Sequence, residues 1–512
     1  MSLSPIRPVL QVICSLSFPC SSSQNLGIPF FLVIFFKRIF GLVLGSVVFL
    51  GCSGPMAHYA GIERSLLVGQ PAQAIQIMQA AKEEYGTKNR LLFLMDQGMV
   101  FHLAGQYAES NAVLEEAHLL IEDLYTKRLR DEASSLLLNE ARQPYVGAPH
   151  EHVMVNVVKA LNYAAQQQWD EALVEARRID HRLNVLSDKE EGKDTYHEDP
   201  FARYLVGLLY EIAGDTNNAY VGYRKAEQVY QEGQVWTRVP LPDVLKSDLI
   251  RTANRLGLHE EAKRYQEHYP EVAYQQEVSQ NRQLAQLVVL TYHGHGPKKE
   301  DLFIDVPISL DALRLVALTK PGLRGSTRKT RGGEALLYGI HGRIARIALP
   351  RFTLNKRSLA LDTIQVRGTT ATITTQSQRM YDINAVAEKT LADEYDSLVL
   401  RAVARTAMKM AAAEGIAIGA RAAAGKNNRD WVGPLVGGIA RVFALATEEA
   451  DIRSWRMLPG EIQFARIWLE PGDYSVAINS GEIQVNATES SSSSGFHLQD
   501  GETRILLLQG GQ

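Results

Sequence analysis

The spacing of apolar residues divides the chain into three parts. Residues 39–50 are an unbroken apolar run, and residues from about 63 to 275 place apolar side chains at the intervals of amphipathic helices. From residue 284 onward, short stretches alternate apolar and polar positions as strands do, with one long helical pattern among them. The pattern predicts a hydrophobic N-terminal segment, a helical region and a mixed region.

The helical region contains an internal repeat. The best unit, Asp199–Glu232, has small and aromatic residues where tetratricopeptide repeats place them: Gly207, Tyr210, Gly214, Ala219, Tyr223 and Ala226. Leu91–Glu122 and Glu151–Asn184 match in the same register, and weaker units surround Gly69 and Gly257. Small residues are needed where paired antiparallel helices approach closely, and stacked pairs bury a continuous core. We therefore predict five helix pairs; a generic helical bundle is the alternative.

The mixed region predicts an antiparallel domain. The strands that we expect are Leu287–Pro297, Phe303–Ile308, Gly342–Pro350, Thr370–Gln376, Glu461–Leu469, Asp473–Asn479, Glu482–Ala487 and Thr503–Gln509. A helical pattern covers Asn384–Ala424, and a second apolar segment, Trp431–Ala450, follows it. The predicted fold class is multidomain α+β: an α-helical tetratricopeptide-like solenoid in residues 63–275, then a mixed, largely antiparallel β domain with a long helical hairpin in residues 284–512.

Composition and charge narrow the function classes. The chain of 512 residues is 46% hydrophobic and 22% charged, which excludes a disordered or fibrous protein. Its 54 basic and 57 acidic residues leave a formal charge of −3 without a long basic block, so we predict no nucleic-acid partner. All three cysteines, Cys14, Cys20 and Cys52, precede the helical region. Disulfides, thiolate metal sites and cysteine catalysis are therefore not expected beyond Cys52.

The N-terminal segment has the parts of an export signal. Lys37 and Arg38 precede the apolar run, which spans about 18 Å as a helix and is too short for a ~30 Å bilayer core. The residues before Cys52 resemble the lipobox of bacterial lipoproteins, although Phe49 stands where leucine is usual. We predict a signal peptide in residues 1–51, with a start that is longer than usual.

The expected mature protein begins at Cys52, which carries the lipid, and continues into a linker over residues 52–62. An uncleaved anchor from Ile28 to Leu50 is the alternative.

Three segments carry a wider resemblance. Tyr196–Ala226, Val288–Glu300 and Ala446–Val476 resemble an uncharacterised family of bacterial lipoproteins with tetratricopeptide-like repeats and a conserved C-terminal domain. The resemblance implies a lipid-anchored protein of the cell envelope that faces the periplasm, and it implies no activity. Ser53, next to Cys52, favours the outer membrane over the inner one by resemblance to the sorting rule of enteric bacteria.

Several clusters have both a chemical and a structural interpretation. His293 and His295 form an i, i+2 pair that fits a metal site or, as we favour, a strand-ending turn. The basic loop Lys320–Gly333 is suited to binding phosphate or anionic lipid headgroups, or it is an exposed, solvated loop, as we favour. The motif Gly415–Gly419 fits helix packing in a membrane or in a soluble hairpin, and the acidic residues around Asp451 fit acid–base chemistry or local ion pairs. We predict no catalytic residue, no metal and no cofactor.

The repeat also predicts where a partner binds. Projection onto a tetratricopeptide helix places a set of mostly apolar side chains on the inner, groove-facing side: Met95, Met99, His102, Phe201, Tyr204, Leu208 and Glu211. We expect a lipid-anchored envelope adaptor or scaffold that binds protein or peptide partners through this groove. A cell-wall-acting enzyme and a structural component of a secretion or surface assembly are the alternatives. Packing of these side chains against neighbouring helices is the competing interpretation.

Overall fold

The chain from His58 to Gln512 forms one compact unit in the computed structural model. The residues that the structure describes are 58–135, 139–189, 196–272, 284–309, 344–353, 360–369, 371–423, 449–480, 483–486 and 495–510. The predicted signal peptide, Cys52 and the basic loop Lys320–Gly333 lie outside them, as does nearly all of Trp431–Ala450. The helical and mixed regions, which the sequence divides at residues 275 and 284, are therefore halves of one body.

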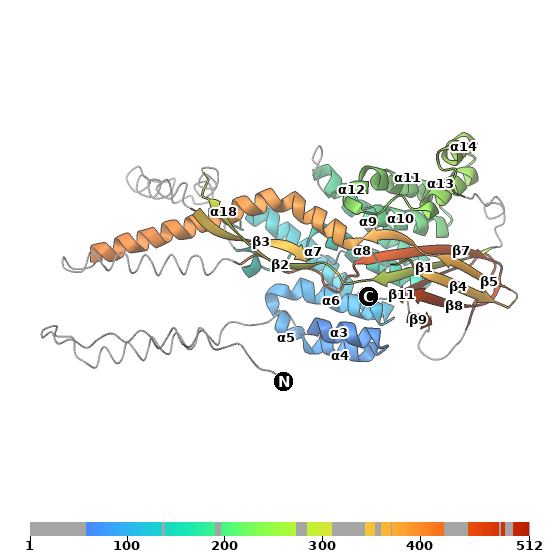
Figure 1. Ribbon diagram of the computed structural model, residues 1–512, viewed down its shortest axis with the longest axis horizontal. Helices are drawn as coiled ribbons and strands as arrows, with labels where there is room; N and C mark the ends of the chain where they lie inside the picture. Colours follow the sequence, from blue (N-terminus) through green and yellow to red (C-terminus); the bar gives the residue numbers. More distant parts are fainter. Residues whose placement is uncertain are drawn as a thin grey trace. The chain divides into compact units, whose positions relative to one another are not determined.

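Five antiparallel helix pairs make up the helical half (Figure 1). The pairs are α3 (His58–Leu67) with α4 (Pro71–Ala80), α6 (Arg90–Leu103) with α7 (Tyr107–Ser135), α8 (Pro149–Ala165) with α9 (Trp169–Lys189), α10 (Pro200–Ile212) with α11 (Thr216–Glu232), and α13 (Asp243–Arg255) with α14 (His259–His268). Shorter turns of helix connect some of them: α5 (Lys82–Tyr85), α12 (Gln234–Thr237), Thr87–Asn89 and Glu140–Arg142. Each pair packs against the next, so the predicted pairs are confirmed. The first helix begins before residue 63, within the predicted linker.

The same turn closes all five pairs. Its central residue has a positive φ each time, at Gly69, Gly105, Gln167, Gly214 and Gly257. In each case the next residue donates its N–H to a carbonyl five positions back, as Gln106 does to Phe101 and Asp215 to Tyr210. Glycine adopts this conformation without strain, which explains its spacing along the sequence. The recurrence identifies the helical half as tetratricopeptide-like repeats.

Within a pair, small residues let the helices touch. A Cβ on Gly207 would lie 2.7 Å from the Tyr223 ring, and a Cβ on Gly222 would lie 2.8 Å from the Cα of Gly207. Gly98 lies as closely against Leu114 of its partner helix. These are the positions at which the repeat pattern required small side chains.

Two sheets in the C-terminal half pack face to face. The first has the order β11-β1-β7-β6, and its strands are β1 (Ala285–His293), β6 (Gln378–Asp382), β7 (Glu461–Leu469) and β11 (Thr503–Gln509). The second has the order β10-β8-β4-β5 with β9 also on β8; its strands are β4 (Thr363–Gly368), β5 (Thr372–Gln376), β8 (Gly472–Ser480), β9 (Ile483–Asn486) and β10 (Phe496–Leu498). Leu287, Val289, Ile364 and Ile478 belong to the core between them.

The strand ranges of β7 and β11 agree with the sequence prediction, whereas β4, β6 and β10 were not predicted. The pairing is antiparallel except between β1 and β11, which run parallel. Strand β1 is buried on both faces. Its odd-numbered residues face the second sheet, and Gln286 and Tyr292 face the helices.

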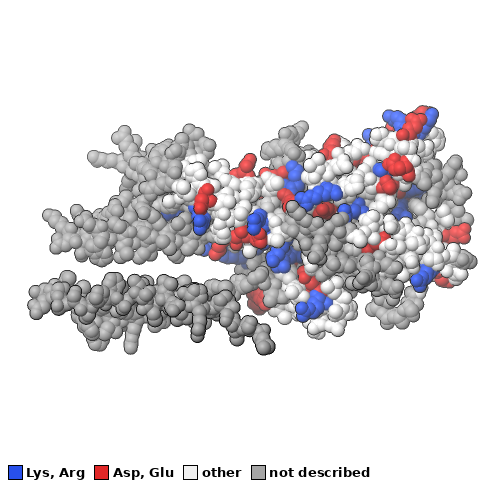
Figure 2. Space-filling model, viewed as in Figure 1, with Lys and Arg blue, Asp and Glu red and all other residues white. Residues whose placement is uncertain are grey.

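A separate hairpin and one long helix complete the fold. Strands β2 (Lys298–Pro307) and β3 (Ile344–Thr353) pair with each other, and α18 (Ile383–Ala423) packs against β3. Their own small core includes Ile347, Leu349 and Ala402. No helix among the described residues combines the length and the apolar character that a bilayer crossing requires. On the face in Figure 2, acidic and basic side chains are interspersed.

Candidate functional site

The residues predicted to line a partner groove are buried, and His102, Phe201, Tyr204 and Glu211 contact the C-terminal half of the same chain. All seven are buried: Met95, Met99, His102, Phe201, Tyr204, Leu208 and Glu211. Phe201 stacks on Tyr381 of β6 at 5.4 Å, and Tyr204 meets Phe464 of β7 edge to face at 5.3 Å. The expectation of an open groove at these side chains is therefore corrected. We call the interface between the helix pairs and the residues from 284 onward the seam.

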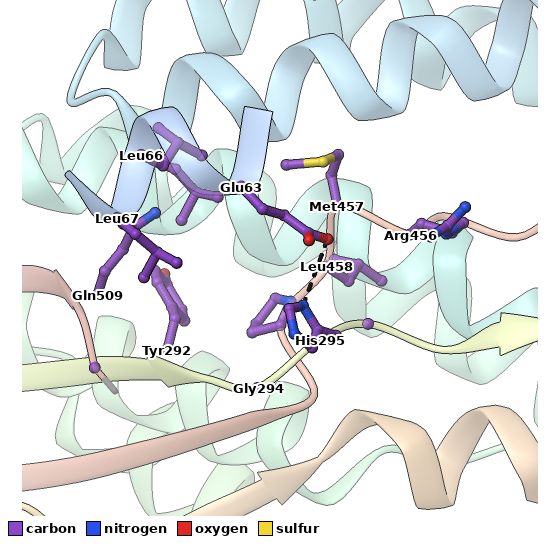
Figure 3. A pocket seen from close by; sticks show the side chains of 14 residues that line it. Glu63, Leu66, Leu67, Tyr292, Gly294, His295, Arg456, Met457, Leu458 and Gln509 are labelled. Atoms are coloured by element: carbon purple, nitrogen blue, oxygen red, sulfur yellow. Dashed lines mark ion pairs between the residues drawn. The ribbon is translucent and has the colours of Figure 1, made fainter. Parts of the chain in front are cut away.

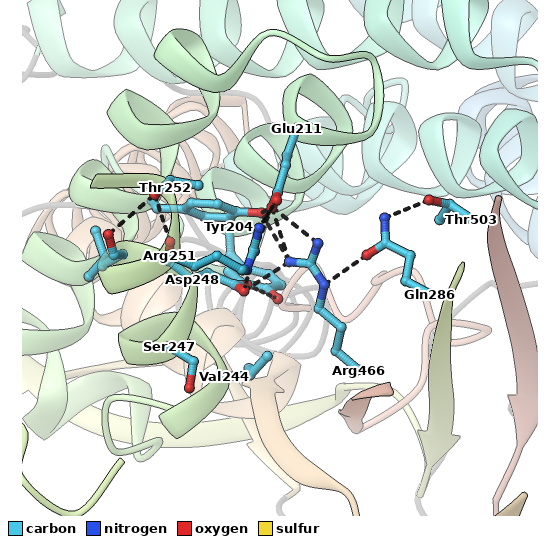
Figure 4. A network of polar contacts seen from close by, with 12 residues as sticks. Tyr204, Glu211, Val244, Ser247, Asp248, Arg251, Thr252, Gln286, Arg466 and Thr503 are labelled. Atoms are coloured by element: carbon cyan, nitrogen blue, oxygen red, sulfur yellow. Dashed lines mark hydrogen bonds and ion pairs between the residues drawn. The ribbon is translucent and has the colours of Figure 1, made fainter. Parts of the chain in front are cut away.

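A charged network joins α10 and α13 to β7 across the seam (Figure 4). Arg466 of β7 reaches Glu211 of α10 at 3.1 Å and Asp248 of α13 at 2.9 Å. Arg251 of α13 pairs with both carboxylates, and Tyr204 donates its hydroxyl to Asp248 at 2.9 Å. These charges are almost fully buried, so each requires its partner.

Electrostatics explain how Glu211 stays ionised there. Burial alone would raise the pKa of its carboxyl, but Arg251 and Arg466 outweigh burial and hold that pKa well below its usual range. Tyr223 adds a hydrogen bond from its hydroxyl at 2.7 Å. On the sheet side, Arg466 is held by Gln286 at 2.9 Å. The network is a structural clasp between helices and sheet.

A segment without helix or strand, residues 451–459, contacts the helix pairs α3–α4, α6–α7 and α8–α9 and the turns between them. The backbone N–H of Trp455 donates to Glu151 of α8 at 2.8 Å, and that of Met457 donates to Asp96 of α6 at 3.3 Å. The Arg453 guanidinium donates to the carbonyl groups of Gln143 and Glu140, at 2.9 and 2.8 Å. Carboxylates of the repeats thus bind two backbone N–H groups of this segment, and the segment's own Arg453 binds two backbone carbonyl groups between the repeats. These contacts give a structural role to part of the segment Ala446–Val476, which carries the resemblance to the lipoprotein family.

Asp96 differs from Glu211 in its neighbours. It accepts hydroxyl hydrogen bonds from Tyr59 at 2.5 Å and from Tyr85 at 2.8 Å, together with the Met457 N–H. Burial raises the pKa of Asp96 to about 7, although these three donors lower it. Its charge therefore changes near neutral pH.

His102 joins the repeats to β1 through two buried hydrogen bonds. One ring nitrogen lies 2.8 Å from the Tyr292 hydroxyl, and the other lies 2.6 Å from the Asn162 amide oxygen. Burial lowers the pKa of His102 to about 4, so the ring is neutral at neutral pH. This residue is a structural contact of the seam.

The histidines of the HGHG turn have separate partners. His293 lies 2.8 Å from Asp362 inside the sheets, and His295 lies 3.4 Å from Glu63 of α3 at a shallow pocket that Arg456 and Leu66 also line (Figure 3). No group of three potential metal ligands occurs among the described residues. Strand β1 ends at His293, as the turn interpretation expected.

Asp451 of the acidic cluster makes a local ion pair, whereas Glu448 lies outside the described residues. Asp451 binds Arg453 at 2.6 Å. Gly415 and Gly419 lie in α18.

A cleft lies between α13 and the edges of both sheets. Its volume is about 290 Å³, and its walls include Asp243 and Ser247 of α13, Thr375 of β5, and Trp468 of β7. The Arg251 and Arg466 guanidinium groups lie 5.2 and 4.9 Å from the Trp468 ring. The cleft therefore adjoins the clasp on one side and strand β5 on the other.

Sequence reasoning missed the seam residues Asp96, Asp248, Arg251 and Arg466. One signal was available for two of them. Asp96 interrupts the apolar helix RLLFLMDQGMVF, and Arg466 interrupts the apolar strand EIQFARIWL. A lone charge in a run that is otherwise buried requires a partner from elsewhere in the fold.

The fold and the seam define a helical-repeat protein that is closed by an α+β half. No protein-family model and no curated protein matches the chain. Similar solved structures include MamA (residues 41-end) from Desulfovibrio magneticus RS-1, with 18% identity over 45% of this chain and 99% of that one, and a TM-score of 0.28. Another is a Podosopora anserina kinesin light chain with TPR-like repeats, with 13% identity over 44% and 95%, and a TM-score of 0.29. The repeat assignment rests on the helix pairs and turns of this chain.

Proposed function

We propose that the protein is a non-enzymatic scaffold that binds protein partners. One observation carries the proposal: carboxylates of two different repeats, Asp96 and Glu151, bind backbone N–H groups of the segment 451–459. Repeats with this chemistry recognise polypeptide, and here they already hold one within the chain. Further polypeptide recognition by the same molecule is the function that fits best.

The proposed location is the bacterial cell envelope, with a lipid on Cys52 as the anchor. The support is the basic flank, the short apolar run and the single cysteine that follows it. The outer membrane is favoured by Ser53. Intact mass of the membrane-extracted protein would test the anchor, since acyl chains on a polypeptide beginning at Cys52 are expected, and an unacylated chain with its original N-terminus would contradict it.

The groove face of the helix pairs is already covered by strand β7 of the same chain. A partner that entered at Tyr204 or Glu211 would have to displace β7 and break the clasp, because both side chains are buried against it. We therefore propose that partners bind the closed form from outside the seam.

Partner capture tests the function. The tagged full chain would be cross-linked in envelopes of its own bacterium, solubilised in detergent and purified beside a Cys52→Ala control that lacks the proposed anchor. We expect a defined protein in near-equal amount with the wild type and less with the control. Turnover of cell-wall material by the purified full chain, or the absence of any such protein, would contradict a non-enzymatic scaffold.

A further inference from the structure

Among the strands that the structure describes, β5 is an edge of the second sheet. It pairs with β4 on one side and ends the strand order on the other. All of its residues are exposed except Thr375, which is half-buried. Ile373 exposes 40% of its surface, although it lies on the face that carries Val366 of the intersheet core. An apolar side chain at this position indicates that the edge is incompletely covered.

The register shows which backbone groups point outward. Gly368 donates its N–H to the Ala371 carbonyl, and Ser377 donates its N–H to the Asp362 carbonyl. Because hydrogen-bonded pairs alternate along an antiparallel ladder, the backbone groups of Ala371, Ile373, Thr375 and Ser377 point towards β4. The N–H and C=O groups of Thr372, Thr374 and Gln376 therefore point away from β4. Among the described residues, none of these groups has a hydrogen-bonded partner in the sheet.

The edge strands of the first sheet are used within the fold. On β6, the Met380 carbonyl accepts the Tyr230 hydroxyl at 2.6 Å. On the opposite edge, β11 packs against α8. In contrast, β5 has the sequence TITTQ, which contains no charge, no proline and no bulge. Charges, prolines and bulges are the features by which proteins usually protect an open edge from pairing. Because β5 has none of them, it is suited to pairing with another strand.

The cleft beside Trp468 opens next to this edge, because Thr375 and Gln376 form part of its wall. Asp243 and Glu271, which also line the cleft, both bind the single amine of Lys246, at 2.8 and 2.7 Å. Two half-exposed carboxylates thus share one cation. Arg251 and Arg466 also line the cleft, and their charges are matched by Asp248 and Glu211. Asp243 and Glu271 together carry one charge more than Lys246 neutralises, so this side of the cleft favours a basic side chain from whatever pairs with β5.

We infer that β5 is a docking edge, to which an extended segment of a partner protein adds as a strand while one of its basic side chains enters the cleft beside Trp468. The inference rests on the proposed scaffold function and gives it a binding mode. Main-chain hydrogen bonds to Thr372, Thr374 and Gln376 supply register, and the cleft supplies selectivity.

The test uses the detergent-solubilised full chain and a labelled, end-capped peptide, Thr-Ile-Thr-Arg-Thr-Ile-Thr, followed by fluorescence anisotropy. We expect saturable binding. The peptide with Asp in place of Arg, and the peptide methylated on the backbone nitrogens that face β5, should each bind about tenfold more weakly or worse. Equal binding by the methylated peptide would overturn strand addition, and equal binding by the Asp peptide would overturn the role of the cleft.

Two variants locate the site. Thr374→Pro removes an outward N–H, which an edge strand tolerates because β4 does not use it, whereas Thr374→Val changes the side chain and keeps the N–H. Binding should be lost in the first variant and retained in the second. Residue-resolved hydrogen exchange on the wild type gives a measurement that needs no variant: the peptide should slow exchange at Thr372, Thr374 and Gln376, and unchanged exchange there would overturn the proposal.

The outcomes separate this inference from the proposed function. If the cross-linked partner is still captured by Thr374→Pro, the scaffold stands and the docking edge is wrong. If the peptide binds but no partner is captured, the edge stands and the scaffold fails. A dimer of the full chain that Thr374→Pro dissociates would mean that a second copy occupies the edge, which also overturns the proposal.

Discussion

Two buried carboxylates join the repeats to the C-terminal half by different chemistry. Glu211 is matched by the guanidinium groups of Arg251 and Arg466, whereas Asp96 receives only neutral donors. Burial raises the pKa of both, and only at Glu211 do cations reverse the shift. One end of the seam is therefore held by charge over a wide pH range, and the other depends on a proton.

The largest expected effect comes from breaking the clasp. Arg466→Met would leave Glu211 and Asp248 buried with fewer positive partners, and we expect a loss of about 3–5 kcal/mol in the free energy of unfolding, measured by urea denaturation. Arg346→Met is the matched control, because Arg346 makes an exposed pair with Asp305 and its loss should have no measurable effect. A wild-type unfolding midpoint for Arg466→Met would contradict the clasp.

The pH dependence of stability should distinguish the two ends. The pKa of Asp96 is raised from 3.8 to about 7 in the folded state, so its contribution is fully present below about pH 3.8 and is lost as pH rises towards 7. We expect about 2–3 kcal/mol less stability at pH 7 than at pH 5 from this residue, at about 1.4 kcal/mol per pH unit. Glu211, whose folded pKa is lowered, loses its contribution only in acid.

Asp96→Asn is the variant that isolates this effect. Urea midpoints measured from pH 3 to pH 8 should vary less between pH 5 and pH 8 in Asp96→Asn than in the wild type, while the loss of stability in acid that Glu211 contributes remains. Identical pH profiles for the two proteins would show that Asp96 does not titrate in this range.

Overpacking the helix pair beneath the clasp should have the next effect. Gly207→Leu forces the added side chain against Tyr223, whose hydroxyl donates to Glu211, and should cost about 1–3 kcal/mol. Gly61→Ala is the control, since a Cβ there meets Ile77 at an ordinary 3.4 Å. A melting temperature for Gly207→Leu equal to that of the wild type would argue against the close helix contact.

The smallest effect is expected at the proton-dependent end. Tyr85→Phe removes one of the two hydroxyl groups that bind Asp96 and should cost about 1 kcal/mol at neutral pH. Because the lost hydrogen bond lowered the pKa of Asp96, the pH midpoint of the stability change should also move upward. Thermal unfolding across the same pH series measures both quantities, and a downward movement would exclude the direct contact.

Local patterns determined much of this fold from the sequence alone. Each repeat turn needs a residue at positive φ, and glycine occupies that position in four of the five such turns. The strands β7 and β11 carry strong apolar patterns and were predicted at their observed bounds. Strands β4, β6 and β10 are short, and their pattern depends on neighbours that are distant in sequence, so they were missed. The remaining turn, which is the third along the chain, has Gln167 in place of glycine at the position of positive φ.

Only the tertiary structure decided what the repeats bind. Phe201 and Tyr204 contact the strands of the C-terminal half, and the same apolar pattern suits a foreign peptide or the chain's own sheet equally well. The choice depends on complementary charges that lie far apart in sequence: Glu211 and Asp248 in the repeats, and Arg466 in β7. A buried charge is stable only beside its partner, and that proximity is created by folding.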